Sequence, residues 1–230
     1  MTVANRPPSV RPLAPRLTAE FMGTAFLVAA VVGSGVMGER LAGGNVALAL
    51  LANTIATGAA LAALILTFGA ISGAHFNPVV TLADAIKGGQ PWGDAAAYIG
   101  VQIAGGVAGT ILAHLMFGLS PLSLSQHARH GWALILSEFV ATFGLMIVIL
   151  GCSRSRQSAV PYAVAAYITA AYWFTPSTSF ANPAVTIARS LSDTFTGIRP
   201  SDVPMFIAAQ VCGGLAATLV FGRIFSQIPV

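Results

Sequence analysis

Apolar residues occupy this chain in six long runs that short polar segments separate. The runs cover residues 17–37, 46–68, 95–117, 132–150, 161–175 and 205–225. A helix needs about 20 predominantly apolar residues to cross the hydrocarbon core of a bilayer. Each run is therefore predicted to be a membrane-spanning helix, and the fifth has the least defined start, near Ser158.

Two near-identical tripeptides lie about half a chain apart: Asn77-Pro78-Val79 and Asn182-Pro183-Ala184. Short apolar runs follow them, over residues 80–86 and 185–191. Asparagine caps a helix N-terminus, and proline suits the first helical position because the N–H that it lacks would have no partner there. Both runs are too short to cross a bilayer. They predict two half-helices whose N-terminal ends meet inside the membrane and line a pore.

The composition agrees with a membrane location. Hydrophobic residues make up 56% of the 230 residues and charged residues 8%, whereas soluble domains carry about 25% charged residues. The net charge of +4 lies between the apolar runs, so it indicates topology and not affinity for nucleic acid. Cys152 and Cys212 form no metal-ligand spacing, so no metal or other cofactor is predicted. No grouping of catalytic residues supports an enzyme.

Three polar anchors recur in the same order in the two halves of the chain: Glu20 with Glu138, Asn77 with Asn182, and Gln102 with Gln210. Each half, residues 16–118 and 131–225, contains three predicted spans. Because three is an odd number, the second half must cross the membrane in the opposite orientation. The chain is thus predicted to be an all-α membrane protein with six transmembrane helices and two re-entrant half-helices. These form one channel domain, 16–230, built from an inverted repeat, after a disordered tail, 1–15.

The distribution of basic residues predicts the orientation. Seven of the 11 Lys and Arg residues fall on the side of the N-terminal tail: Arg6, Arg11, Arg16, Lys87, Arg154, Arg156 and Arg223. Segments rich in Lys and Arg stay in the cytoplasm. Both termini are therefore expected in the cytoplasm, with the chain crossing the inner (cell) membrane several times.

These motifs resemble the major intrinsic protein family, the aquaporins and aquaglyceroporins. The most specific matches are Ala19-Glu20-Phe21-x-Gly23-Thr24, Ser72-Gly73-Ala74-His75-Phe76-Asn77-Pro78 and Asn182-Pro183-Ala184. The resemblance implies an hourglass pore in each subunit of a homotetramer in the lipid bilayer. It also implies passage of water and small neutral solutes without energy input.

The residue after the second tripeptide departs from the family pattern. Most members have arginine there, a fixed cation at the narrowest point, whereas this chain has Val185. Gapless counting from the two asparagines puts Thr57, Ala170 and Ser179 at the other filter positions. Such a filter is wide, weakly polar and uncharged. It predicts a permissive channel for glycerol, urea and undissociated metalloid acids such as arsenous acid, as well as water.

Two charged residues occupy matching places after the half-helix caps, Asp84 in the first half and Arg189 in the second. Arg189 lies one helical turn beyond Val185. One interpretation makes it a displaced cationic gate in the outer vestibule, with Asp84 at the cytoplasmic mouth. The other makes both of them ordinary charges at half-helix ends near the interface.

Glu20 and Glu138 are the only acids well inside predicted spans. Intramembrane carboxylates suggest ion or proton pathways. Their symmetric placement instead predicts that each accepts backbone N–H bonds from the half-helix loop of its own repeat. Gln102 and Gln210 are expected to share this structural role, and His75 is expected to support its loop.

Three other functions remain open. A secondary transporter also uses inverted repeats and broken helices, but it needs titratable residues at the midplane, where only Glu20 and Glu138 could serve. A water-selective or simple glycerol channel is the alternative among channels. A member without conduction, acting through adhesion or assembly, is less compatible with the short loops.

Overall fold

The computed structural model describes residues 11–225 and consists of helices joined by turns and loops. Within this part of the chain the α-helices are α1 (Leu13–Leu41), α2 (Val46–Ser72), α3 (Pro78–Ile86), α4 (Trp92–Met116), α5 (Trp132–Ser155), α6 (Val160–Phe174), α7 (Pro183–Arg189) and α8 (Val203–Phe225). Two single 3₁₀ turns, Gln157–Ala159 and Pro200–Asp202, precede α6 and α8.

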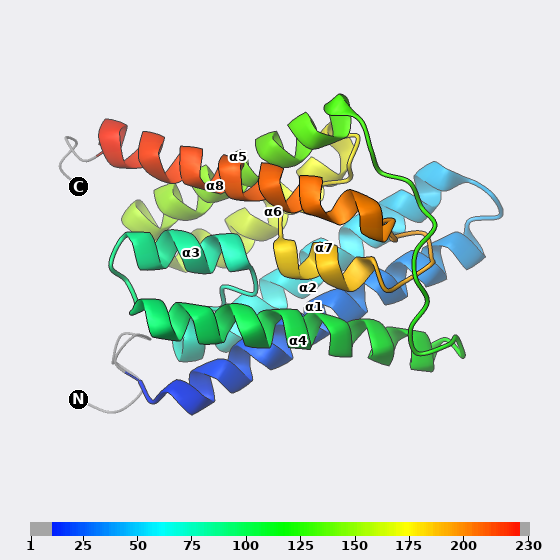
Figure 1. Ribbon diagram of the computed structural model, residues 1–230, viewed down its shortest axis with the longest axis horizontal. Coiled ribbons are helices and arrows are strands. Elements are labelled where there is room, and N and C mark those ends of the chain that lie inside the picture. Colours follow the sequence, from blue (N-terminus) through cyan, green and yellow to red (C-terminus); the bar gives the residue numbers. More distant parts are fainter. Residues whose placement is uncertain (1–10, 226–230) are drawn as a thin grey trace.

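The long helices form a bundle around the two short ones (Figure 1). Helices α3 and α7 lie near the centre almost in line, and they extend in opposite directions from adjacent N-terminal ends. Helix α1 begins and α8 ends at the same end of the bundle. This arrangement is the one that six crossings and two half-crossings produce.

Five of the described helices are long and apolar enough to cross a membrane: α1, α2, α4, α5 and α8. The remaining predicted span, 161–175, is the helix α6, which has only 15 residues. At about 1.5 Å per residue it measures about 22 Å, less than the ~30 Å of a hydrocarbon core. The preceding 3₁₀ turn and the extended residue Thr175 continue its path at the two ends.

The start of α1 corrects the predicted tail. Residues 1–10 lie outside the described part of the chain, but the helix begins at Leu13, inside the segment 1–15 that was expected to be a tail. Pro15 is compatible with this start because the N–H groups of the first helical turn have no intrahelical partner. The predicted boundary is therefore too late.

Glycines allow the helices of each repeat to pack backbone against backbone. A Cβ on Gly105 of α4 would lie 2.4 Å from the carbonyl oxygen of Phe21 in α1, and one on Gly213 of α8 would lie 2.4 Å from that of Phe139 in α5. No side chain fits at such a distance. Helix α1 packs extensively on α4, and α5 packs extensively on α8, so the two halves repeat the same close packing.

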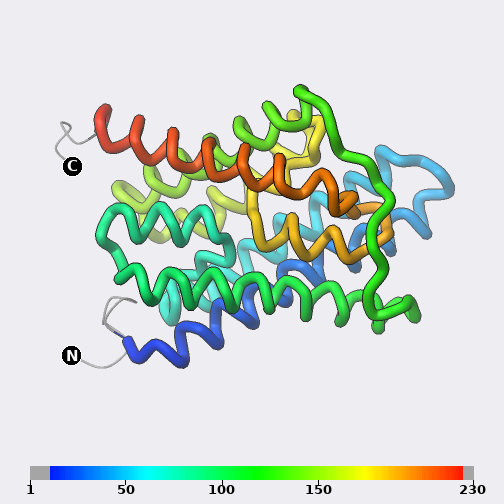
Figure 2. The backbone as a smooth tube through the Cα atoms, in the orientation of Figure 1, coloured from blue at the N-terminus to red at the C-terminus, as the bar shows by residue number. Residues whose placement is uncertain are grey.

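The connection between the halves crosses one end of the bundle. Residues 117–131 run from the end of α4 past α7 to the start of α5 (Figure 2). The N–H groups of Ser123 and Ser125 donate to the carbonyls of Leu191 and Ser190, at 3.0 Å each. These two bonds fix the connection against the end of α7 and the residues that follow it.

Candidate functional site

The caps of the two half-helices meet at the centre of the bundle. The side-chain oxygen of Asn77 accepts the N–H of Val79 at 2.9 Å, which caps α3, and its amide nitrogen donates to the carbonyl of Ala181 at 2.7 Å. Asn182 caps α7 in the same way and donates to the carbonyl of Phe76 at 2.7 Å. Each asparagine therefore fixes its own helix and binds the loop of the other repeat.

The two helix N-termini produce a positive centre. Each contributes the equivalent of about half an elementary charge, although α3 and α7 have only nine and seven residues. In Figure 1 both N-termini face the middle of the bundle. This geometry disfavours cations at the midpoint and leaves neutral molecules unaffected.

Glu20 holds the loop that leads into α3. One carboxylate oxygen accepts the Ser72 hydroxyl at 2.6 Å and the His75 N–H at 3.0 Å, and the other accepts the Phe76 N–H at 2.7 Å and the Gln102 amide at 2.8 Å. The side chain is fully buried. Four donors compensate for the loss of its hydration.

Glu138 repeats this arrangement for the loop that leads into α7. It accepts the N–H groups of Phe180 and Ala181, each at 2.9 Å, and the amide of Gln210 at 2.7 Å. The structure contains the backbone bonds expected for both carboxylates. The two glutamines do not accept such bonds: their amide nitrogens donate to the carboxylates, and their oxygens have no partner within the described residues. Because these acids are engaged with backbone and amide donors, they act as supports of the loops.

The supported loops have strained backbone. Four non-glycine residues have φ between +48° and +51°, namely Ala74, Phe76, Ser179 and Ala181. A left-handed conformation at such residues costs on the order of 1–3 kcal/mol each and persists only where the surroundings enforce it. The buried glutamates supply that enforcement by accepting the N–H groups of these same loops.

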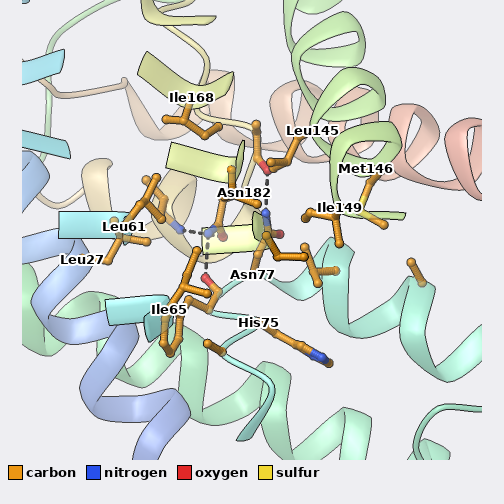
Figure 3. A pocket seen from close by; sticks show the side chains of 18 of the residues that line it. Leu27, Leu61, Ile65, His75, Asn77, Leu145, Met146, Ile149, Ile168 and Asn182 are labelled. Carbon is orange, nitrogen blue, oxygen red and sulfur yellow. Dashed lines mark hydrogen bonds between the residues drawn. The ribbon is translucent and has the colours of Figure 1, made fainter. Parts of the chain in front are cut away.

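A cavity of about 250 Å³ passes the two caps. It extends from Asp84, Lys87 and Ser153 at one end to Thr57 and Tyr172 at the other. Figure 3 shows the Asn77 and Asn182 amides among aliphatic side chains: Leu27, Leu61 and Ile65 on one side, Leu145, Met146 and Ile149 on the other, and Ile168 above them. The site thus combines a few fixed polar groups with apolar walls.

The end of the cavity near α7 differs from the predicted filter at two positions. Thr57 and Val185 line the cavity as expected. Ala170 is exposed on the outer surface of α6 and does not line it, whereas Tyr172 does. Ala170 and Tyr172 are two residues apart, which corresponds to about 200° around the axis of α6. The residues between Phe174 and Asn182 are not helical, so counting back from Asn182 gives the wrong face.

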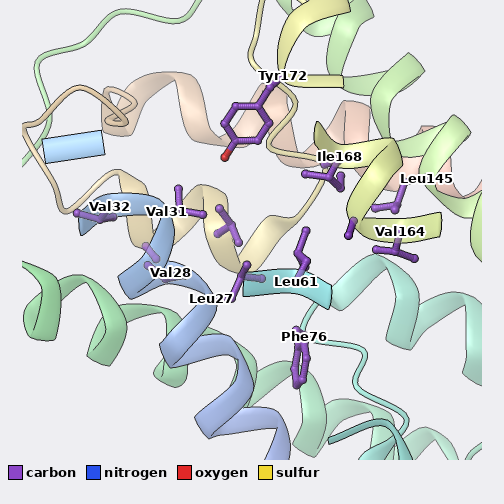
Figure 4. Close-up of a cluster of buried hydrophobic side chains, with 14 of the residues drawn as sticks. Leu27, Val28, Val31, Val32, Leu61, Phe76, Leu145, Val164, Ile168 and Tyr172 are labelled. Carbon is purple, nitrogen blue, oxygen red and sulfur yellow. The ribbon is translucent and has the colours of Figure 1, made fainter. Parts of the chain in front are cut away.

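Ser179 also lies outside the cavity lining. It is only 3% exposed, and its hydroxyl has no hydrogen-bond partner within the described chain. The next residue, Phe180, lines the cavity in its place. The Tyr172 hydroxyl lies 3.3 Å from the Thr57 hydroxyl, and Figure 4 shows it directed toward the side chains of α1 and α2.

The two charged candidates have different positions. Asp84 is half-buried and lines the cavity together with Lys87, a position compatible with the interpretation that places it at the cytoplasmic mouth. Arg189 is 1% exposed and does not line the cavity. It is therefore neither a side chain in the vestibule nor an exposed charge at the interface. Its guanidinium stacks on the ring of Phe180, which is one of the lining residues.

His75 has the supporting role predicted for it and also reaches the cavity. Its Nδ1 lies 3.1 Å from the hydroxyl of Thr81, one turn into α3, and its side chain belongs to the lining. Thr81 in turn accepts the amide of Gln102 at 2.9 Å, and Thr186 accepts that of Gln210 at 2.8 Å.

Sequence reasoning missed several of these residues. Tyr172 and Phe180 have no signal in the sequence that distinguishes them from other aromatic residues of the chain. Thr81 and Thr186 do have a signal, because each follows its Asn-Pro pair at the same spacing in the two repeats.

Comparisons with known proteins agree with this geometry. The model of the family described as Major intrinsic protein matches residues 10–174. Aquaglyceroporin AqpS of Rhizobium meliloti (strain 1021) is 56% identical over 202 residues, which cover 88% of this chain and 86% of that protein. Aquaporin NIP1-4 of Oryza sativa subsp. japonica is 33% identical over 217 residues, covering 90% of this chain and 76% of the relative.

Solved structures show the same fold. The aquaglyceroporin from Plasmodium falciparum superposes with a TM-score of 0.74 at 17% identity, covering 93% of this chain and 97% of that one. The sequence matches, the paired half-helices and the membrane-spanning bundle lead to one conclusion. The chain belongs to the major intrinsic protein family, a family of multi-pass membrane channels.

Proposed function

We propose that this channel is permissive and conducts glycerol, urea and undissociated metalloid acids such as arsenous acid, as well as water. The observation that carries the proposal is Val185. An apolar side chain lines the cavity directly after the second Asn-Pro-Ala, where the family pattern places a charged arginine. The similarity to AqpS, an aquaglyceroporin, supports the same choice.

The polar groups of the cavity suit small neutral polyols and hydroxides. Asn77 and Asn182 each have a second amide N–H besides the one that binds the opposite loop. Further along, the hydroxyls of Thr57 and Tyr172 can donate or accept. Aliphatic walls offer the carbon skeleton of a solute a weak contact. A few polar sites in an apolar passage bind weakly enough for the solute to leave again, as conduction requires.

The two acids inside the predicted spans are not available for coupling to an ion gradient. Glu20 and Glu138 are fully buried and accept hydrogen bonds from the half-helix loops. Protonating either one would remove acceptors that hold strained backbone in place. We therefore favour passive flux over ion-coupled transport.

A water-selective channel is the second candidate, and Tyr172 favours it. The sequence predicted a small Ala170 at this level, but the structure has an aromatic ring whose hydroxyl lies 3.3 Å from Thr57. A ring narrows the passage between α2 and α6. Water selectivity would then come from Tyr172 in spite of the missing arginine.

For the assembly we propose a homotetramer in the inner membrane with both termini in the cytoplasm. The common end of α1 and α8 supports termini on one side. The excess of Lys and Arg on that side supports its cytoplasmic location. The tetramer is carried over from the family. We also retain the division into two inverted repeats, residues 16–118 and 131–225.

Light scattering from vesicles that contain the purified protein tests the permissive function. A gradient of glycerol, urea or arsenous acid should first shrink the vesicles and then allow reswelling. In Val185→Arg, reswelling with glycerol should slow at least about tenfold while the water permeability changes little, because the new guanidinium narrows the filter. Val185→Thr, which keeps the size of the side chain, is the matched control. Absence of reswelling with all three solutes in the parent channel would refute the proposal.

A further inference from the structure

Two arginines come together beside one aromatic ring of the cavity wall. The guanidinium carbon of Arg189 lies 3.3 Å from the centroid of the Phe180 ring, and that of Arg129 lies 5.1 Å from the same centroid. Arg189 ends the half-helix α7, whereas Arg129 comes from the connection between the repeats. Segments 60 residues apart in the sequence thus place two cations at one site.

Neutral carbonyl groups hold both guanidinium groups. Arg189 donates through Nε to the carbonyl of Thr196. Arg129 donates through Nε to the carbonyl of Gly197 at 2.7 Å and through Nη1 to that of Ser177 at 3.2 Å. Carbonyl dipoles orient the two cations and leave their net charge in place.

No carboxylate in residues 11–225 forms an ion pair with either guanidinium. Asp202 accepts the backbone N–H of Arg129 at 2.8 Å, but its side-chain ion pair is with Arg199. Glu138 is the acid whose charge acts on both arginines, and its oxygens already accept the loop N–H groups. Burial lowers the pKa of Arg129, yet a guanidinium stays protonated at neutral pH.

The position of the pair relative to the lumen is the decisive feature. Phe180, Val185 and Tyr172 line the cavity, whereas Arg189 packs on the Phe180 ring and does not itself belong to the lining. The lumen surface that these three lining residues form is uncharged. A positive potential therefore reaches the lumen through the wall, and no charged side chain narrows the passage.

We propose that Arg189 and Arg129 form the cation barrier of this channel, from behind its wall. Their charge raises the potential at Val185 and excludes cations, and their side chains leave the path of neutral solutes open. Size selection and charge selection then belong to different residues: Val185, Tyr172 and Thr57 set the width, and the two arginines set the charge. The inference rests on the proposed function only in that neutral solutes pass this level.

The expected size of the effect follows from Coulomb's law. Two unit charges about 10 Å apart at an effective dielectric constant of about 20 repel enough to lower cation occupancy roughly tenfold. Salt weakens this repulsion little, because Arg189 is buried. Removing one arginine should therefore raise cation entry by about that factor, and the helix N-termini at the caps continue to oppose cations.

Urea and guanidinium are the probes for the test, since both are small and planar and differ in charge. Uptake of each labelled compound is measured in phosphatidylcholine vesicles that contain the whole channel. The parent should take up urea at least about tenfold faster than guanidinium. Arg189→Met should raise the ratio of guanidinium to urea uptake about tenfold, and Arg189→Lys, which keeps the charge, should leave the ratio near that of the parent.

Arg40→Met is the matched control, because Arg40 also packs on an aromatic ring, 5.2 Å from the Phe117 centroid, but is exposed at the end of α1. Equal uptake of the two probes by the parent would overturn the proposal. So would an unchanged ratio in Arg189→Met, or an equally raised ratio in Arg189→Lys.

Arg129→Met provides a second test if Arg189→Met fails to fold, because Arg129 is only partly buried. A raised ratio of guanidinium to urea uptake in this variant supports the proposed cation barrier, and an unchanged ratio contradicts it. A parent channel that takes up no urea would refute the urea permeability proposed above. Guanidinium entry into the arginine variants, compared with the parent, would still report on the barrier.

Discussion

Replacing Glu138 by glutamine should destabilise the channel, because the carboxylate accepts three donors. One oxygen accepts the N–H of Phe180, and the other accepts the N–H of Ala181 and the amide of Gln210. A glutamine at 138 has a single acceptor oxygen. The amide would direct this oxygen toward the two donors that now share one carboxylate oxygen, so its NH₂ group would face the N–H of Phe180.

The magnitude follows from that one donor. A buried donor that loses its acceptor costs about 1–3 kcal/mol, so the variant should lose about 1–3 kcal/mol of stability. For a chain of this size about 1 kcal/mol corresponds to a change of roughly 2–4 °C in Tm. We expect Glu138→Gln to melt at least about 2 °C below the parent.

Thermal unfolding of the purified channel in detergent measures this change, and water flux in vesicles reports its effect on the pore. The flux should fall because the loosened loop carries the Ala181 carbonyl that binds Asn77. Glu39→Gln makes the same chemical change at an exposed position near the end of α1 and should melt with the parent. If Glu138→Gln also melts with the parent, the carboxylate does not hold the loop and our reasoning is wrong.

Two further substitutions test the packing and the width of the pore. Gly105→Val should prevent stable insertion or assembly, because even a Cβ would lie 2.4 Å from the Phe21 carbonyl oxygen. Gly100→Val should be tolerated, because nothing lies within 4 Å of a Cβ at that position. Size-exclusion profiles of the two purified variants measure the difference. Tyr172→Ala should raise the ratio of glycerol to water permeability severalfold, because it removes the ring opposite Thr57. If light-scattering assays give the same ratio as for the parent, Tyr172 does not set the width of the filter.

Local chemistry explains why much of the fold could be predicted. An asparagine followed by a proline specifies a helix start locally, because the asparagine side chain caps the helix and the proline suits its first position. Helices α3 and α7 therefore begin where the sequence places them. The roles of Glu20 and Glu138 were predictable for a different reason. A polar group that recurs at the same place in two repeats must satisfy the same backbone donors twice.

The misplaced residues depend on information that the local sequence lacks. Whether Ala170 or Tyr172 faces the lumen is decided by the length of non-helical chain after Phe174. The burial of Arg189 depends on Phe180 and on carbonyl groups near Thr196, which only the folded loops bring to it. Helix phase after a loop and burial of a charge are properties of the tertiary structure.

The reciprocal bonds between the caps have a consequence for the order in which the chain is made. Asn77 donates to the carbonyl of Ala181, which is 104 residues further along the chain. Proteins are synthesised from the N-terminus, so the first repeat enters the membrane before its partner exists. During that interval the Asn77 amide and the Phe76 carbonyl lack their final partners. The centre of the channel is therefore completed only when the second repeat has been inserted, and a chain stopped before Asn182 cannot form it.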